Sequence, residues 1–502
     1  MKKFLLCILL FLSFSSFYGQ CPDRYISLNT QADLDNFKTT YPNCTEILKD
    51  LSISGSDITN LSALNEITKI NGMLSLKNTS LVNLNSLNNL ETIGTLFLER
   101  NENLQNLTGL EGLTSIKNID IKYNYALTSL DGLSNITKID EDLTLTNSSA
   151  LIDISGLSGL IEVGGNFSIG GVSVATFAAF NQLQLVNGNL SITSISALTQ
   201  LSNFTSLHTV GGVLTVKNHP YLNSISGFPV LAQIGGFNLD NNDSLHTISG
   251  FSALQTINGD FNLGRYSRYS NRDGNDVLVD ISGFNALLIV TGNMLVHGNI
   301  ILSNLTGLEN LSTVQGDLGI YYNDNLLNLD GLDGLQTIGG KLLIYDNNKL
   351  VELDGLSELK NVNGDVIIAA SDALQSLAGL NELINVGGNF QIGWYRNNTG
   401  DANHALVDAE FQQLKTVGGD LRFSSNALIP NIIGFNNLES VGGLIQISGS
   451  PEAQNISGFN KLTTIGSSIS ISGLKIVNKT GIFLFWTCEK YTKSACSPVW
   501  CF

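Results

Sequence analysis

The sequence has little proline, little charge and few of the side chains that dominate catalytic sites. Of its 502 residues only 7 are Pro and 5 are His, and charged residues make up 14%, against about 25% in a typical soluble domain. Acidic residues outnumber basic ones by 43 to 26, which gives a formal net charge of −17. Because nucleic acids and anionic membranes bind basic surfaces, this charge argues against both as partners.

Long hydrophobic runs are also absent, apart from one at the start. "FLLCILLFLSFSSF" follows Lys2 and Lys3 and is shorter than the roughly 20 apolar residues that a membrane-spanning helix needs. A basic end followed by a short apolar core is typical of a secretory signal peptide. We therefore expect residues 1–19 to be removed, the mature chain to have no membrane-spanning segment, and the protein to be secreted or held at the cell surface.

Cysteine is scarce in the predicted mature chain, which has five. Cys21 and Cys44 lie on either side of one short segment, and in an oxidising compartment they can form a disulfide. Cys488, Cys496 and Cys501 lie within 14 residues of one another, and their pairing stays open. The cysteine spacing matches no zinc pattern, so the sequence predicts neither a metal site nor a cofactor.

What the sequence has in abundance is a glycine-rich repeat. The pattern [IV]-x-G-x-L-x-I recurs in 18 copies from residue 47 onward, and fifteen of the seventeen spacings are 23 or 24 residues. The L-x-I part alternates like a short strand. Asn or Gly often follows it and turns the chain, and [LI]-x-G-[LF] comes next. Such regularity predicts stacked coils. We expect an all-β chain that forms a long parallel β-helix of about 18 coils over residues 47–478.

One segment has a helical pattern instead. Thr30 is suited to the N-cap position, Leu34 and Phe37 fall on one face, and Pro42 ends the run. We expect a short helical cap within residues 20–46 that covers the open first coil. Residues 479–502 match no repeat and are predicted to be a separate tail.

The stretch "TQADLDNF…YPNCTEILKDLSISG", followed by the IxGxLxI and LxGL copies, resembles the receptor L-domain family. These domains open with a helix and then a Cys just before the first strand. The resemblance covers about residues 21–478 and implies a right-handed β-helix of leucine-rich-repeat-like coils. The family includes ligand-binding modules of the insulin and epidermal growth factor receptors, fungal cell-wall proteins and bacterial surface or secreted proteins. The signal peptide and the long array are similar to the bacterial kind.

The sequence offers no constellation for catalysis. The outward middle residues of the L-x-I strands include one carboxylate, Asp120, whereas hydrolysis of polysaccharides needs paired carboxylates. Asp-rich corners such as "NLDGLDGL" are typical of Asx turns rather than of calcium sites. We expect a non-enzymatic protein. The alternatives are a β-helical carbohydrate-active enzyme with carboxylates on another face, a purely structural surface protein, and an ice-binding ladder of outward Ser and Thr.

Two repeat units are longer than the rest, at 33 and 31 residues, with inserts near 264–277 and 393–405. Both open with Phe-x-[IL]-Gly and close with Asn-[DH]-[VA]-Leu-Val-Asp, so we expect them to leave the coil at the same corner. Four of the seven Arg lie in them, together with Tyr and Trp, the residues enriched in binding hot spots. The predicted binding residues of the inserts are Arg265, Tyr266, Arg268, Tyr269, Arg272, Trp394, Tyr395 and Arg396.

The strand face between the two inserts is unusually apolar and aromatic. The same outward positions carry mostly Ser, Thr, Asn, Lys or Gly in other coils. We expect an exposed strip that, together with the inserts, binds a protein or a carbohydrate. The alternatives are simple β-propensity, or a loop or tail that covers the strip. The predicted binding residues of the strip are Leu295, His297, Tyr321, Leu343, Tyr345 and Ile367.

Overall fold

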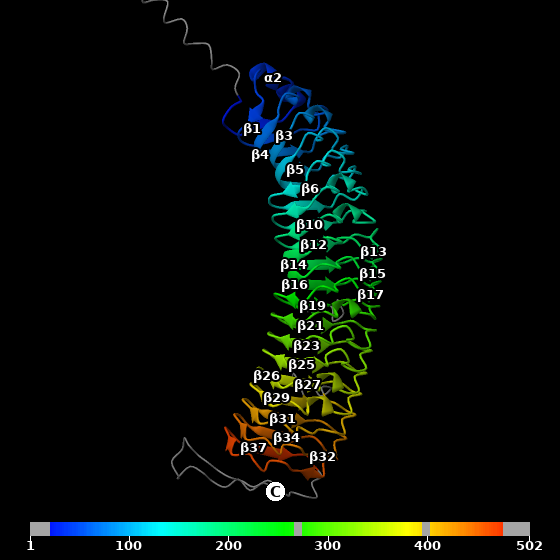
Figure 1. Cartoon of the computed structure of the whole chain (residues 1–502), viewed down its shortest axis with the longest axis vertical. Helices are drawn as coiled ribbons and strands as arrows, with labels where there is room; N and C mark the ends of the chain where they lie inside the picture. Colours follow the sequence, from blue (N-terminus) through cyan, green and yellow to red (C-terminus); the bar gives the residue numbers. More distant parts are fainter. Residues whose placement is uncertain (1–20, 266–273, 394–401, 475–502) are drawn as a thin grey trace, which may run out of the picture. The chain divides into compact units, whose positions relative to one another are not determined.

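The computed structural model describes residues 21–265, 274–393 and 402–474, and they form stacked coils of short parallel strands (Figure 1). The chain divides into two compact units. Residues up to Tyr221, with Gly227–Leu231, form the N-terminal unit, and Leu222–Ser226 with residues from Ala232 onward form the C-terminal unit. The predicted all-β class and the parallel β-helical coils are confirmed.

In the N-terminal unit the longer strands of successive coils pair in parallel, from β3 through β4, β5, β6, β8, β10 and β12 to β14. The elements are β1 (Ile26–Leu28), α1 (Gln31–Asp35), α2 (Phe37–Thr40), β2 (Glu46–Ile47), β3 (Leu51–Ser54), η1 (Ser62–Leu64), β4 (Lys69–Lys77), η2 (Asn85–Leu87), β5 (Thr92–Glu99), β6 (Ser115–Lys122), β7 (Lys138–Ile139), β8 (Leu143–Thr146), η3 (Ser155–Leu157), β9 (Glu162–Val163), β10 (Phe167–Gly170), η4 (Ala178–Phe180), β11 (Leu185–Val186), β12 (Leu190–Thr193), β13 (Gln200–Leu201) and β14 (Thr209–Lys217).

In the C-terminal unit a second parallel stack runs from β16 through β19, β21, β23, β25, β27, β29, β31 and β34 to β37. The elements are β15 (Ser224–Ile225), β16 (Gln233–Asp240), β17 (Thr247–Ile248), β18 (Thr256–Ile257), β19 (Phe261–Leu263), η5 (Ser282–Phe284), β20 (Ile289–Val290), β21 (Met294–His297), β22 (Thr313–Val314), β23 (Leu318–Tyr321), β24 (Thr337–Ile338), β25 (Leu342–Tyr345), η6 (Asp354–Leu356), β26 (Asn361–Val362), β27 (Val366–Ala369), η7 (Ala378–Leu380), β28 (Asn385–Val386), β29 (Phe390–Gly393), β30 (Thr416–Val417), β31 (Leu421–Ser424), β32 (Asn431–Ile432), β33 (Ser440–Val441), β34 (Ile445–Ser448), β35 (Asn455–Ile456), β36 (Thr464–Ile465) and β37 (Ile469–Ser472).

The repeat pattern translates directly into one coil. In the coil that begins at β24, two glycines form a corner, β25 follows, and the LxGL segment forms the 3-10 turn η6. The four residues predicted to point inward here, Leu342, Ile344, Leu353 and Leu356, are all fully buried. The glycines are required by close stacking, because a Cβ on Gly339 would lie 2.1 Å from the carbonyl oxygen of Gln315 in the preceding coil.

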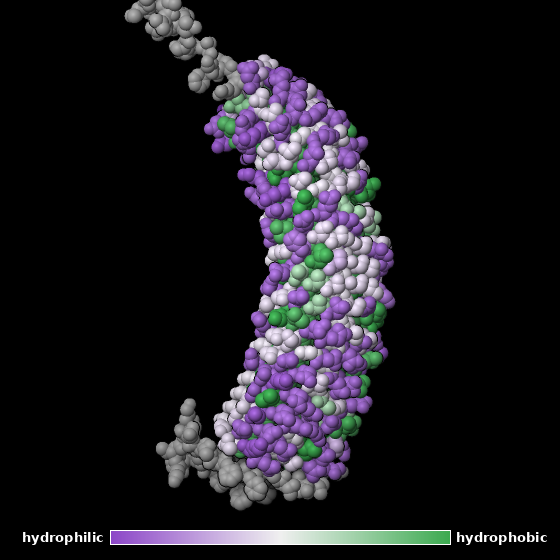
Figure 2. Space-filling view, viewed as in Figure 1, coloured by the Kyte–Doolittle hydropathy of each residue, from purple (hydrophilic) through white to green (hydrophobic). Residues whose placement is uncertain are grey.

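The described residues bury their apolar side chains inside the coils and leave only separate ones outside. Twelve of the largest fully buried side chains are Phe, and they pack on one another, as Phe251 does on Phe284 with ring centroids 5.0 Å apart. The face shown in Figure 2 is mainly hydrophilic with small, separate hydrophobic areas. The core is therefore a continuous filling within each stack, while the surface residues are free to vary from coil to coil.

A buried ladder of asparagines ties each coil to the next. In the C-terminal unit Asn275, Asn299, Asn323 and Asn347 are all fully buried. The backbone N–H of Asn299 donates to Oδ1 of Asn323 at 3.1 Å, and that of Asn323 donates to Oδ1 of Asn347 at 3.1 Å. Their Nδ2 groups donate to backbone carbonyls of preceding coils. The ladder side chains therefore provide hydrogen-bond partners for backbone N–H and C=O groups that would otherwise be buried without any.

Outside the two long units, the residue just before the ladder position turns the chain through a left-handed backbone conformation in most coils. Its φ is +49° at Asn78, +52° at Asn147 and +60° at Asn218, a region that Asn and Gly adopt at low cost. The sequence pattern predicted this turn. The pattern did not predict the ladder, because in the sequence the ladder Asn cannot be told apart from the exposed Asn residues of the same loop.

The predicted cap is present in the N-terminal unit. Thr30 and Asp33 form a capping box, in which the Thr30 side chain and the backbone N–H groups of Asn29 and Thr30 hold the pKa of the Asp33 carboxyl below its usual value. The helix is divided at Asn36 into two short segments, α1 and α2, which bury Leu34 and Phe37 respectively. The predicted disulfide between Cys21 and Cys44 is formed.

Removing one ladder amide should cost more stability than removing an exposed one. Asn299→Ala deletes the acceptor of the Asn275 N–H and the donor to the Leu263 carbonyl, so we expect a loss of about 1–3 kcal/mol in the free energy of unfolding. Urea denaturation of the purified protein measures it. The control is Asn348→Ala, which replaces the exposed residue directly after the ladder residue Asn347. It should change the free energy of unfolding by less than about 0.5 kcal/mol. Equal effects of the two substitutions would contradict a structural role for the ladder.

The ladder also predicts a pH effect at His219, which takes the Asn position in its coil and is fully buried. A neutral ring can donate from Nε2 to the Ile192 carbonyl at 3.0 Å and accept at Nδ1 from the Ile195 N–H at 3.3 Å. Burial lowers the pKa of His219. Protonation is therefore easier in the unfolded chain, and stability falls as the pH drops below about 6.5.

His219→Asn keeps one donor and one acceptor but does not titrate. We expect its unfolding free energy to fall less than that of the wild type between about pH 7.5 and pH 5, because the other histidines are common to both proteins. Denaturant titrations at the two pH values measure the difference. Parallel pH profiles would show that His219 does not stay neutral in the folded protein.

Candidate functional site

The predicted strip lies on the outward face of β21, β23, β25 and β27 in the C-terminal unit, and the pairing aligns it in two columns. Leu295, Gly319, Leu343 and Ile367 are register partners in the first column. His297, Tyr321, Tyr345 and Ala369 are partners in the second. The structure therefore brings together the six strip residues that the sequence singled out, as neighbours on successive coils.

The two columns differ in exposure. Leu295, Leu343 and Ile367 are half-buried and reach the surface. His297 is fully buried and Tyr345 is 3% exposed. The prediction that the whole strip is exposed is therefore wrong for His297 and Tyr345, whereas Tyr321 in the same column is half-buried like the residues of the first column.

Stacking of the aromatic rings contributes to this burial. The Tyr321 and Tyr345 rings stack with centroids 4.5 Å apart, and the His297 ring meets Tyr321 edge-on at 5.0 Å. Tyr322 adds a further edge contact, 5.4 Å from Tyr345. The second column is thus a packed aromatic cluster beside an apolar column of half-buried Leu and Ile.

Tyr322 stands out by its backbone. It occupies the corner position with a φ of +58°, where most other coils have Asn, Ser, Asp, Ala or Gly and two have Arg100 and Tyr123. A bulky residue in the left-handed region costs free energy, and such residues persist where the surrounding structure holds them, often at functional sites. The free-energy cost at Tyr322 indicates that the aromatic cluster is more than a chance grouping of surface residues.

Of the predicted insert residues, Arg265 is described and is exposed at the start of the first insert. The others, Tyr266, Arg268, Tyr269, Arg272, Trp394, Tyr395 and Arg396, lie outside the described residues, and their assignment stays a prediction.

The bases of both inserts have the same construction. The chain leaves the coil at Gly264 and Gly393, with φ of +96° and +86°, and rejoins it at Asn275 and Asn403, which take their places in the ladder. The flanking strands keep their register across each long unit, since β19 pairs with β21 and β29 pairs with β31. The expected common corner is confirmed.

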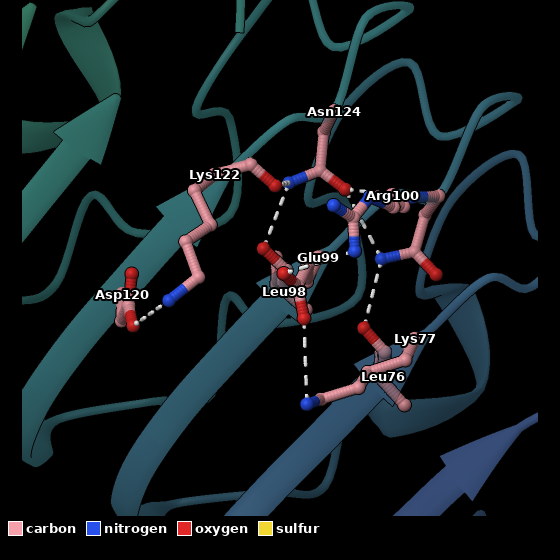
Figure 3. Close-up of polar contacts among 9 residues, drawn as sticks. Leu76, Lys77, Leu98, Glu99, Arg100, Asp120, Lys122 and Asn124 are labelled. Atoms are coloured by element: carbon pink, nitrogen blue, oxygen red, sulfur yellow. Dashed lines mark hydrogen bonds and ion pairs between the residues drawn. The ribbon is translucent and has the colours of Figure 1, made fainter. Parts of the chain in front are cut away.

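A second cluster of charged and aromatic side chains lies on the outward face of β4, β5 and β6 and at the corners that follow β5 and β6 in the N-terminal unit. Figure 3 shows its charged members. From the sequence, Asp120 stood out only as the one carboxylate among the outward middle residues of the L-x-I strands. The signal that could have found the cluster is the series Lys, Glu, Lys at one outward position of three consecutive coils. Its members, called the cation–aromatic cluster below, are Lys77, Phe97, Glu99, Arg100, Asp120, Lys122 and Tyr123.

A depression of about 440 Å³ in the N-terminal unit bears on the enzyme alternative. It is lined by Thr45, Glu66, Thr68, Asn88, Asn89, Glu91 and Gly112. Of its two carboxylates, Glu66 is paired with Lys38, and both glutamates lie at the surface. Within residues 21–265, 274–393 and 402–474, no group of three or more His, Cys, Asp or Glu is arranged to hold a metal ion.

The exit corners can be tested by adding one methyl group. A Cβ on Gly393 would lie 1.8 Å from the carbonyl oxygen of Ser424, and the left-handed backbone alone costs a non-glycine residue about 1–3 kcal/mol. We expect Gly393→Ala to lower the free energy of unfolding by at least that amount in denaturant titrations. In Gly159→Ala, the nearest heavy atom to the new Cβ would be the Ser134 carbonyl oxygen at 3.4 Å, so this control should have little effect. Tolerance of Gly393→Ala would contradict the corner geometry.

A family model described as Receptor L domain matches residues 43–131 and 184–260. No curated protein sequence matches the chain. Among solved structures, a crystal structure of a TLR13–ssRNA13 complex aligns over 89% of this chain and 78% of that chain, with 14% identity and a TM-score of 0.30, too low to carry an argument. No helix in the described part of the chain is long and apolar enough to cross a membrane. By this match and by their coil pattern, the segments 43–131 and 184–260 are similar to receptor L domains.

Proposed function

We propose that the protein is a secreted or cell-surface binding protein without catalytic activity, and that it binds a protein or carbohydrate partner on the outward face of its coils. A receptor L-domain-like solenoid fits a ligand-binding surface protein. The observation that carries the proposal is the half-buried apolar column of Leu295, Leu343 and Ile367 beside the aromatic cluster. Elsewhere the corresponding positions are mostly polar.

The proposed platform consists of this column as its floor and the two inserts as its walls. The inserts leave the solenoid five coils apart, which corresponds to roughly 24 Å at about 4.8 Å per coil. That span suits an extended peptide, a short oligosaccharide or the edge of a protein. The aromatic rings hold the floor rigid, and the Arg residues of the inserts supply donors for acidic or hydroxylated groups.

Two features support an extracellular location of the protein. The short apolar N-terminal segment is typical of export, and a disulfide such as Cys21–Cys44 persists in an oxidising compartment. Both support a place outside the cell. How the chain is anchored there is not part of the proposal.

The charge pairing on the strand face supports a non-enzymatic role. The one outward carboxylate in the first column of positions, Asp120, pairs with Lys122 at 3.0 Å, whereas glycoside hydrolysis uses two carboxyl groups on either side of the scissile bond. Glu66 and Glu91 in the depression are the observation that would favour an enzyme. Assays of polysaccharide hydrolysis with Glu66→Gln and Glu91→Gln test that alternative.

The platform can be tested by replacing its floor with the residues that other coils have. Leu343→Ser and Ile367→Ser introduce the residue found at this position in β10 and β12, so the backbone should be unaffected. A screen of the mature protein against glycans and proteins would identify the partner. We then expect the double variant to bind it with about 2 kcal/mol less free energy, as measured by calorimetry.

The matched control is Ser191→Ala on the corresponding strand position of the N-terminal unit, which should leave affinity unchanged. Trp394→Ala tests the wall. If the partner binds equally well to the double variant and to a chain lacking both inserts, the site lies elsewhere.

A further inference from the structure

The cation–aromatic cluster combines a row of alternating charges with an aromatic centre. Lys77, Glu99 and Lys122 are register partners on β4, β5 and β6. Lys77 Nζ lies 3.3 Å from Glu99 Oε2, and Arg100 Nη1 lies 3.4 Å from Glu99 Oε1. Figure 3 shows Lys77 and Arg100 converging on Glu99, while Lys122 is paired with Asp120.

The aromatic side chains lie against these cations. Lys77 Nζ and Lys122 Nζ lie 4.5 and 4.6 Å from the centroid of the Phe97 ring. The Arg100 guanidinium carbon lies 5.3 Å from the Tyr123 ring, which in turn meets Tyr125 edge-on. These distances are within the range of cation–π attraction, so the cluster is ordered before any partner arrives.

The cluster is locally positive on an acidic chain. It has three cations against two carboxylates, whereas the whole chain has a net charge of −17. The side chain of Arg100 is 59% exposed and has one long contact with Glu99. Its guanidinium has five N–H donors, so several remain available to a carboxylate from outside.

The backbone gives a second, independent indication. Arg100 and Tyr123 occupy the left-handed corner of consecutive coils, with φ of +53° and +58°. The corners of the coils on either side have Asn78 and Asn147, residues that adopt this conformation more easily. Two bulky side chains are therefore held in a strained position that asparagine would fill at lower cost, and strain of this kind points to a function of the side chains.

We propose that the cation–aromatic cluster is a docking surface for a second protein that presents an acidic surface, separate from the platform of the C-terminal unit. An exposed Arg next to a half-buried Tyr and a half-buried Phe forms the pattern of a protein–protein hot spot. The depression is lined by other residues, and small ligands favour concave sites. The positive centre supplies charge complementarity to a partner rich in Asp and Glu.

Arg100→Asn and Tyr123→Asn separate binding from folding, because they relieve strain while deleting the docking groups. The probe is poly-L-glutamate immobilised for interferometry, compared with polygalacturonate as a carboxylated glycan. We expect the intact mature chain to bind polyglutamate, more weakly as salt rises toward about 0.15 M. Each variant should bind at least tenfold less tightly, with an unchanged or higher melting temperature. Lys217→Ala removes one cation from the strand position of β14 that corresponds to Lys77 and should bind like the wild type.

Several results would overturn the proposal. Failure of the wild type to bind polyglutamate, or binding to polygalacturonate alone, would exclude an acidic protein as the partner. Equal binding by wild type and Arg100→Asn would exclude the cluster as the site. A lower melting temperature of Arg100→Asn with unchanged binding would show that Arg100 has a purely structural role. Loss of binding in Lys217→Ala would show that polyglutamate binding depends on the net charge of the chain and not on the cluster. Because the variants leave the C-terminal unit untouched, none of these results bears on the platform.

Discussion

The structure depends on one constraint: a coil of some 24 residues buries backbone groups at its corner, and these groups need hydrogen-bond partners. The buried asparagine ladder meets that need in most coils, with one polar side chain in each. Each amide accepts from the N–H of a preceding coil and donates to a carbonyl behind it. Where Asn is missing, Thr79, Ser148, His219, Ser371 or Ser450 takes the position, while Val172 and Ile195 fill it in two adjacent coils; all of these residues are buried. Stacking of coils, rather than any single coil, is therefore the unit of stability.

Because the ladder and the inward apolar residues stabilise the stacking of the coils, the outward residues contribute little to the stability of the fold. Long inserts are accommodated between a left-handed Gly and a ladder Asn without loss of strand register. The outward positions can then carry a Ser and Thr face, a cation–aromatic cluster or an apolar and aromatic strip. Both special surfaces place a bulky residue at a left-handed corner, Arg100 and Tyr123 in one and Tyr322 in the other. A constant frame with locally specialised faces is what a binding solenoid requires.

The sequence was sufficient to predict the features that repeat with the coil. Core positions such as Leu342 and Leu356, the cap at Thr30, the Cys21–Cys44 bridge and the common exit corner at Gly264 and Gly393 follow from local patterns that each recur or have a known physical cause. The burial of His297 and Tyr345 could not be predicted, because it depends on how rings from successive coils pack on one another. The ladder and the cluster were missed because their partners in neighbouring coils are 22 to 36 residues apart, and only an alignment of coils places Lys77 beside Glu99.

The most direct test of this account is hydrogen exchange of the ladder amides, followed by mass spectrometry on the mature chain. Asn275, Asn299 and Asn323 lie outside the strands, yet their N–H groups donate to buried side-chain oxygens. The account predicts that they exchange as slowly as the amides of β21 and β23, and that Asn299→Ala accelerates the exchange of Asn275 first. Exchange at the rate of exposed corner amides, with the strands still protected, would show that the coils are held together without the ladder.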